Sequence, residues 1–195
     1  KCRQAGCHVK QTEPYSPWSN SCEVAIKECK GAAGRDLRAS KCPKKLWDDC
    51  LERRAYIRSF TAHDIYSLMG EVPDTLVNGE SPDISEFSQF KWYEWVKYRD
   101  QQVAFPDDNF VLGRYLGPSS DIGPAMTCKI LNVKGNYIHR STVRALTPDE
   151  VADVLEIKER NAFDIAIEAK LGPCAKPEDF GDESLDCDTP QGTLY

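Results

Sequence analysis

The chain has 195 residues, of which 41% are hydrophobic and 29% are charged, and its formal net charge is −6. No apolar run approaches the roughly 20 residues of a membrane span and no secretory signal opens the chain, so we expect a soluble intracellular fragment of one or two small domains. The nine cysteines are an odd number, which favours thiols over a disulfide framework.

The charge is unevenly distributed along the chain. Residues 1–60 hold 13 Lys and Arg against 7 Asp and Glu, residues 61–146 hold 8 against 11, and residues 147–195 hold 4 against 13. The excess of positive charge in residues 1–60 suits phosphate binding in that part of the chain only. The candidate DNA-binding residues crowd into nineteen positions: Lys27, Lys30, Arg35, Arg38, Lys41, Lys44 and Lys45. A merely solvated basic face is the alternative interpretation.

A helix is expected to begin close to Ser21. Pro14 and Pro17 restrict the backbone before it, and Ser19 or Asn20 can cap its first N–H groups. An apolar stripe then recurs at three- and four-residue intervals: Cys22, Ala25, Ile26, Cys29, Ala33 and Leu37. A neighbouring face carries Glu23, Lys27 and Lys30. Periodicity alone favours a solvated face with a Glu–Lys ion pair over a functional site.

A second helix is expected from residue 43 to about residue 60. Leu46, Trp47 and Cys50 open its apolar side, and Trp47 is predicted to lie in the core. Asp48 and Asp49, like Asp36 before them, are interpreted as helix-surface residues. Residues 72–90 alternate turn residues with single apolar anchors, which is typical of a connecting segment, and the boundary is placed near residues 83–87.

The pattern then changes to short strands at residues 91–99, 111–116, 125–131 and 137–146, separated by Pro- and Gly-containing turns. Four or five strands within residues 90–146 predict a small barrel. Trp92, Tyr93, Trp95 and Tyr98 are expected to fill it rather than to stack on a base. The strands also carry Lys129, Lys134, Arg140 and Arg144, which can contact phosphates or simply face solvent.

Residues 147–171 are predicted to form one helix that opens with a capping box at Thr147 and Glu150 and ends at Gly172. Residues 172–195 are acidic and poor in aliphatic side chains, which predicts a disordered linker. His63 and His139 are expected to be structural. Cys2, Cys7 and His8 lack the further ligands that a zinc site needs.

The start of the chain resembles the integrases of Copia-type retrotransposons, in which a Cys-x-x-x-Gly region, a Pro-Tyr-(Thr/Ser)-Pro turn and an Asn precede a catalytic Glu at the opening of a helix. The matching residues are Cys2, Gly6, Pro14, Tyr15, Pro17 and Asn20, and Glu23 follows Pro17 by six positions where the commonest form has seven. Residues 90–146 resemble the SH3-like domain that follows the integrase core in these polyproteins.

The resemblance implies an α+β chain. Residues 1–65 would be the C-terminal helices of an RNase H-like integrase core, residues 66–89 a linker, residues 90–146 an SH3-like β-barrel, residues 147–171 a helix, and residues 172–195 a disordered acidic linker before reverse transcriptase.

The implied function is DNA integration, by Mg²⁺-dependent (or Mn²⁺-dependent) 3′-end processing and strand transfer in the complete integrase. Glu23 would be the third catalytic and metal-ligating carboxylate, and Lys27 and Lys30 would hold the donor DNA end. The two Asp ligands are expected upstream of Lys1, so the chain alone should be inactive.

The implied partners are element and host DNA, with homo-oligomers in the full integrase, no membrane, and a location in nucleus and cytoplasm. The alternative is a non-catalytic module, derived from a retroelement, that binds nucleic acid or protein.

Overall fold

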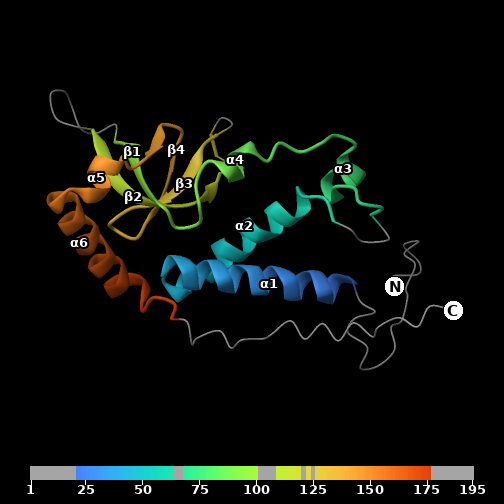
Figure 1. The fold of residues 1–195 in the computed structure, drawn as a ribbon, viewed down its shortest axis with the longest axis horizontal. Coiled ribbons are helices and arrows are strands. Elements are labelled where there is room, and N and C mark those ends of the chain that lie inside the picture. The colour runs from blue at the N-terminus through green and yellow to red at the C-terminus, as the bar shows by residue number, and fades with distance from the viewer. Residues whose placement is uncertain (1–20, 64–67, 101–108, 120–121, 124–125, 177–195) are drawn as a thin grey trace.

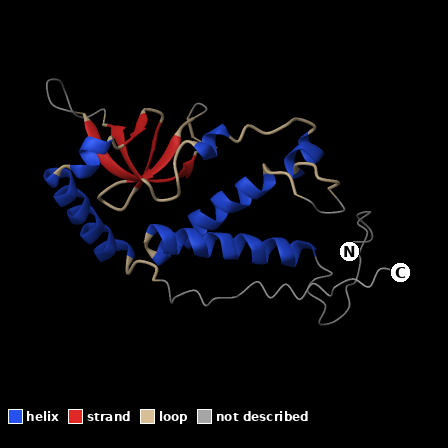
Figure 2. Cartoon of the chain, in the orientation of Figure 1, coloured by secondary structure: helices blue, strands red, loops and turns tan. Residues whose placement is uncertain are grey.

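The structure is a computed structural model, and it describes residues 21–63, 68–100, 109–119, 122–123 and 126–176. Helices cover one side of an open, five-stranded antiparallel sheet, so the expected α+β class is confirmed (Figures 1 and 2). The turn at Pro14 and Pro17, the Cys2, Cys7 and His8 group, and residues 177–195 of the predicted linker lie outside the described residues. Within the described part, no helix is long and apolar enough to cross a membrane.

Two helices open the described chain. Helix α1 spans Ser21–Ser40, and a 3₁₀ turn at Lys44–Leu46 leads into α2, Trp47–Ser59, so both expected helices are confirmed. They pack through Ala33 and Leu37 of α1 against Leu46 and Cys50. Two ion pairs tie the helices together along one side, Arg54 with Asp36 and Arg58 with Glu28.

The predicted burial of these helices is partly wrong. Ile26 is 54% exposed and Cys22 is exposed, so only the second half of the α1 stripe is buried. Trp47 is 55% exposed, because Leu46, Asp49, Cys50 and Arg53 form the inner face of this region. Asp49 was expected on the surface, but it is buried because Lys129 and Tyr137 of the sheet bind its carboxylate.

The predicted connecting segment contains two short helices, α3 at Pro73–Asn78 and α4 at Ser85–Ser88. Phe87 of α4 is buried and lies in ring contact with Tyr56 and Phe60, at or just beyond the end of α2. Arg53 of α2 donates hydrogen bonds to the carbonyl oxygens of Phe87 and Phe90, both at 3.3 Å. The end of this segment is therefore packed onto α2.

The strands are β1 (Trp95–Arg99), β2 (Phe110–Pro118), β3 (Cys128–Leu131), β4 (Tyr137–Arg140) and β5 (Val143–Ala145). All neighbours pair antiparallel in the order β4-β3-β2-β1-β5. The expected strand at residues 111–116 is confirmed as β2, while β1 begins only at Trp95 and β3 only at Cys128. The single strand expected at residues 137–146 is wrong, because Ser141 and Thr142 divide it into β4 and β5. Tyr93, with φ +58°, lies in the turn before β1.

The sheet is strongly curled. Strands β4 and β5 lie at its opposite edges, yet only Ser141 and Thr142 separate them in the chain. Three residue steps reach about 11 Å at most, whereas the edges of a flat five-stranded sheet are about 19 Å apart. The register of the β2–β3 pair also slips between Tyr115 and Gly117, a bulge that sharpens the bend.

Hydrophobic cores form on both sides of the sheet. One contains Val96, Tyr98, Tyr115, Cys128 and Ile130. The other joins the sheet to the helices, and its members come from α1, the turn after it, α2, the turn before β1, the sheet, α6 and the residues after α6: Ala33, Leu37, Cys42, Leu46, Cys50, Trp92, Tyr93, Leu112, Leu116, Leu131, Phe163, Ile167 and Ala175. The core role predicted for the aromatic residues before and in β1 is confirmed.

The predicted single helix after the sheet is two helices, α5 (Pro148–Ala152) and α6 (Val154–Leu171). The capping box of Thr147 and Glu150 is confirmed. Asp153 breaks the helix because its backbone is extended and its side chain caps the N–H of Leu155. Phe163 and Ile167 of α6 are buried against the sheet.

The prediction of disorder from residue 172 is wrong for residues 172–176. Gly172 ends α6 with φ +88°. The next residues form an antiparallel bridge at Cys174 and Pro43, with the Lys44 N–H donating to the Pro173 carbonyl and the Ala175 N–H donating to the Cys42 carbonyl. Ala175 is buried in the shared core, which anchors this segment beside α1 and α2.

Candidate nucleic-acid interface

The predicted basic residues lie along α1 and the turn that follows it. Lys27, Lys30 and Arg35 are exposed and Arg38 is half-buried. Lys41 stands in the turn with φ +52°, and Lys44 and Lys45 are exposed on the 3₁₀ turn. Figure 1 shows α1 along one edge of the molecule, with the sheet on the opposite side of α2.

The helix geometry explains how these cations can act together. Lys27 and Arg38 are eleven residues apart, about 16 Å along the axis, and lie about 20° apart around it. Arg35 lies about 60° further round, whereas Lys30 points closer to the buried side. The cations of α1 therefore form an elongated surface rather than a pocket, a shape that suits a polyanion.

Six cations of the sheet and of α2 differ because carboxylates of the same chain bind them. Lys97 pairs with Glu156 at 2.5 Å, Arg114 with Asp164 at 2.8 Å, and Lys129 with Asp49. On α2, Arg54 and Arg58 pair with acidic residues of α1. These side chains hold elements of the protein together and are poorly placed to bind a second anion.

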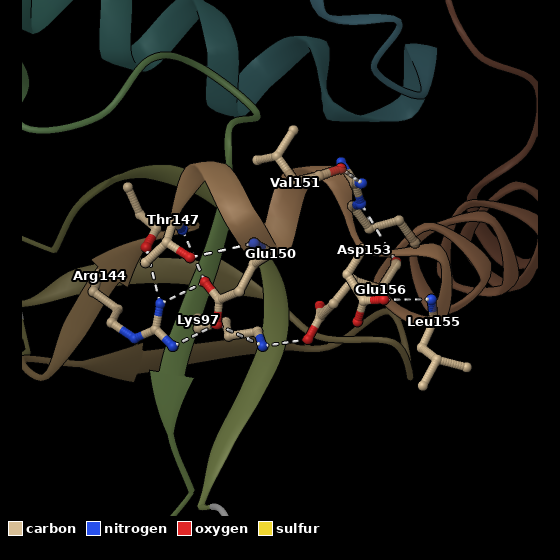
Figure 3. Close-up of polar contacts among 10 residues, drawn as sticks. Lys97, Arg144, Thr147, Glu150, Val151, Asp153, Leu155 and Glu156 are labelled. Atoms are coloured by element: carbon tan, nitrogen blue, oxygen red, sulfur yellow. Dashed lines mark hydrogen bonds and ion pairs between the residues drawn. The ribbon is translucent and has the colours of Figure 1, made fainter.

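The network at the start of α5 illustrates this use of charge (Figure 3). Arg144 donates two hydrogen bonds of 2.7 and 2.8 Å to the Glu150 carboxylate, and the Lys97 ammonium lies 3.0 Å from the same carboxylate. The Arg144 guanidinium and the Thr147 N–H hold the pKa of Glu150 well below its usual range. Of the sheet cations expected to contact phosphates, Lys129 and Arg144 are thus engaged within the protein.

Arg114 has a structural role that the sequence pattern did not reveal. Its guanidinium lies 3.3 Å from the centroid of the Trp95 ring and 4.4 Å from that of Tyr93. It also donates a 3.0 Å hydrogen bond to the Tyr93 carbonyl. Together with the Asp164 ion pair, these contacts fasten α6 to the sheet. No local signal identifies them, because Arg114 and Asp164 are fifty residues apart.

On α1 and the following turn, five cations have no such partner. Within the described part of the chain, no carboxylate forms an ion pair with the side chains of Lys27, Lys30, Arg35, Lys41 or Lys45. Arg38 and Lys44 lie among them and do make contacts within the protein. The surface therefore offers unneutralised positive charge, although the whole chain is acidic.

Glu23, the predicted catalytic carboxylate, is exposed in the first turn of α1, on the side of the helix that carries Lys27 and Lys30. Among the described residues no three His, Cys, Asp or Glu side chains gather closely enough to hold a metal ion. These residues do not form a magnesium site by themselves, so we derive no reaction step through a metal.

A cavity of about 360 Å³ opens between α2, α4 and the sheet, and the sequence pattern did not predict it. Its walls include Asp49 with its partners Lys129 and Tyr137, and His139, whose Nδ1 lies 2.8 Å from Ser119 Oγ. Burial lowers the pKa of Arg53, which also lines the cavity. Three carboxylates and two cations share these walls, so the charge favours no one class of ligand.

The two described histidines contact other residues of the protein, and three of the described cysteines are buried. His63 Nε2 lies 2.7 Å from the Arg58 carbonyl oxygen, and His139 contacts Ser119. The described cysteines form no disulfide: Cys22, Cys29, Cys42, Cys50, Cys128 and Cys174. Burial raises the pKa of Cys128 to about 11 and that of Cys50 to about 12, so both stay protonated thiols near neutral pH.

Comparison with protein-family models, with curated proteins and with solved structures found no match to this chain.

Proposed function

We propose that this chain binds DNA through the basic surface of α1 and its following turn, as part of a Copia-type retrotransposon integrase. The observation that carries the proposal is the division among the cations. Six cations of α2 and the sheet are bound by carboxylates: Arg54, Arg58, Lys97, Arg114, Lys129 and Arg144. By contrast, Lys27, Lys30, Arg35, Lys41 and Lys45 cluster on α1 and its following turn without an ion-pair partner among the described residues. Phosphates are the natural partners of such a surface.

The arrangement of α1 supports the integrase assignment. Glu23 stands in the first turn of α1, with Lys27 and Lys30 one and two turns further on. Val24 and Ile26 remain exposed in the same half of the helix. In our proposal the upstream part of an RNase H-like core covers these residues and supplies two Asp beside Glu23. Magnesium or manganese then binds only in the complete integrase, where oligomers join element DNA to host DNA in the nucleus.

The sheet is proposed to be an SH3-like barrel. Five short strands, the order β4-β3-β2-β1-β5 and the two-residue step between β4 and β5 support this assignment. The barrel here would serve as a scaffold, since Lys97, Arg114, Lys129 and Arg144 bind carboxylates of the protein.

The test measures binding of the chain to duplex DNA by fluorescence anisotropy between 50 and 200 mM salt. Five phosphate contacts predict a slope of log K against log salt of about −4.5, which corresponds to about a 500-fold loss of affinity across this range. The double variant Lys27→Glu and Lys30→Glu removes two contacts, so the slope should become shallower by about 1.8.

The matched control is the double variant Lys91→Glu and Arg99→Glu, which changes the net charge equally at exposed positions away from α1. We expect it to retain the salt slope of the unmodified chain. Equal losses in both variants, or binding that does not depend on salt, would contradict the proposed surface. Circular dichroism spectra of both variants serve to check that they are folded.

The second candidate function is a non-catalytic nucleic-acid-binding or protein-binding module derived from a retroelement. The exposed basic surface of α1 supports it, because that surface can bind an anionic partner without any catalytic residue. The two candidates differ in the complete protein: Glu23→Gln abolishes strand transfer but leaves DNA affinity intact if Glu23 is catalytic. A complete protein without strand-transfer activity that still binds DNA through α1 supports the module.

A further inference from the structure

Helix α6 has two apolar faces. Phe163 and Ile167 are buried against the sheet. Ile165 lies about 200° around the helix from Phe163 and is 69% exposed. Val154 lies about 20° and Leu155 about 80° from Ile165 around the helix, and they are 63% and 72% exposed. Figure 1 shows α6 at the outer edge of the molecule, so this second face points away from the sheet.

The exposed residues form a continuous row, here called the outer seam. Its members are Val154, Leu155, Lys158, Ala162, Ile165 and Ala169, and all of them are exposed. From Leu155 onward they are spaced alternately by three and four residues, which is the pattern of a helix that pairs with another helix. Single exposed aliphatic side chains need no explanation. A row of them at this spacing points to a helical partner.

The charges beside the outer seam identify the partner as a second copy of the same helix, running antiparallel. When identical helices pair antiparallel, each flank of the seam faces the same flank of its mate. One flank carries Glu159 and Lys170, and the other carries Asn161 and Glu168. The midpoint of each pair falls between residues 164 and 165. A two-fold axis at that point therefore places Glu159 opposite the mate's Lys170 and Asn161 opposite the mate's Glu168.

We propose that this chain forms a weak symmetric dimer through the outer seam, with antiparallel α6 helices and Ile165 packed against its own copy at the centre. Ala162 and Ala169 are small enough to let the helices approach closely. Lys170 already donates to the Lys134 carbonyl at 2.5 Å, and its ammonium retains two further donors for Glu159 of the mate.

The dimer should be transient. Only residues 158–171 overlap in this register, which is about 21 Å of helix. Val154 and Leu155 of the outer seam lie beyond the paired helices, so Ile165 is the main aliphatic contact. Such a contact is smaller than a standard interface of about 1,600 Å², so we expect a dissociation constant on the order of 100 µM. Lys158 within the outer seam also helps to fix the register of the two helices, at a cost in the stability of the dimer. The proposal does not depend on DNA binding, because it involves no residue of α1.

Sedimentation equilibrium of the chain from 10 µM to 1 mM tests the proposal. The unmodified chain should show a monomer–dimer equilibrium, and Ile165→Glu should weaken it at least tenfold by placing two carboxylates at the centre. The matched control is Leu76→Glu on α3, because Leu76 is also an aliphatic helix residue and is 55% exposed. This control should dimerise like the unmodified chain.

Charge reversal then tests the register. Glu159→Lys alone and Lys170→Glu alone each create two like-charged pairs, so each should weaken the dimer about fivefold. The double reversal restores both pairs and should return the dissociation constant to within about twofold of the original. A monomer up to 1 mM, a dimer insensitive to Ile165→Glu, an equal loss in Leu76→Glu, or a double reversal that fails to restore the dimer would each overturn the proposal.

Discussion

Two isoleucines on α6 allow the shared core to be tested with one matched comparison. Ile167 is 1% exposed and lies in the core that joins α1, α2, the sheet and α6, whereas Ile165 is 69% exposed on the opposite side of the same helix. Replacing Ile167 by Ala removes three buried carbons at about 0.8 kcal/mol each. The cavity that remains raises the expected cost to about 3–4 kcal/mol.

Replacing Ile165 by Ala should change the free energy of unfolding by less than about 0.5 kcal/mol, because little buried surface is lost and Ala favours the helix. The assay is urea denaturation at low micromolar concentration, where the proposed dimer is dissociated. With Trp18 and Trp47 replaced by Phe in all chains compared, Trp fluorescence reports on the sheet through Trp92 and Trp95, and far-UV circular dichroism reports on the helices.

The unfolding transitions followed by Trp fluorescence and by circular dichroism should coincide in both variants, because one core joins the helices to the sheet. The Tm of Ile167→Ala should fall by about 6–16 °C at 2–4 °C per kcal/mol. Equal effects of the two substitutions would refute the assigned burial. Separate transitions for helices and sheet would refute the shared core and would favour an independent helical fragment.

Two further predictions concern charge and backbone. The pKa of Glu150 is lowered in the folded protein, so its contact with Arg144 stabilises the fold above pH 4.5. This stabilisation is lost as the pH falls below that value. Chemical denaturation should therefore show a smaller difference in the free energy of unfolding between pH 7 and pH 3 for Glu150→Gln than for the unmodified chain. Gly113→Ala should destabilise the protein by about 1–3 kcal/mol, because a Cβ there would lie 2.6 Å from Ile130 Cγ2. The matched change Gly31→Ala, whose Cβ meets only an Arg side chain at 3.7 Å, should instead stabilise α1 by about 0.5–1 kcal/mol, and thermal melts of the two variants should move in opposite directions.

The elements that were predictable from the sequence depend on neighbours in the chain. The start of α1 after the prolines, the capping box at Thr147 and the strands between Gly and Pro turns are all determined within a few residues. The break at Asp153 was missed because one Asp in an apolar periodic run is compatible both with a continuous helix and with a new N-cap.

The burial of charged residues could not be predicted from the sequence in this way. Asp49 is buried because its partners Lys129 and Tyr137 are 80 and 88 residues away in the chain. The position of the basic cluster on α1 follows from helical spacing alone. The pairing of Lys97 with Glu156, 59 residues apart, requires the folded sheet. The sequence therefore locates the candidate cations, and the folded structure separates the unpaired ones from those that bind its own carboxylates.

The bridge between the segment after α6 and the start of α2 bears on the order of folding. The hydrogen bond between Ala175 and Cys42 closes a loop of 133 residues, whereas the contact of Cys50 with Ala33 closes one of 17. Closing the longer loop in an unfolded chain costs about 1.8 kcal/mol more entropy at room temperature. We therefore expect α1 and α2 to associate early and the bridge to close late. Changes at the bridge should accelerate unfolding while leaving the rate of folding nearly unchanged.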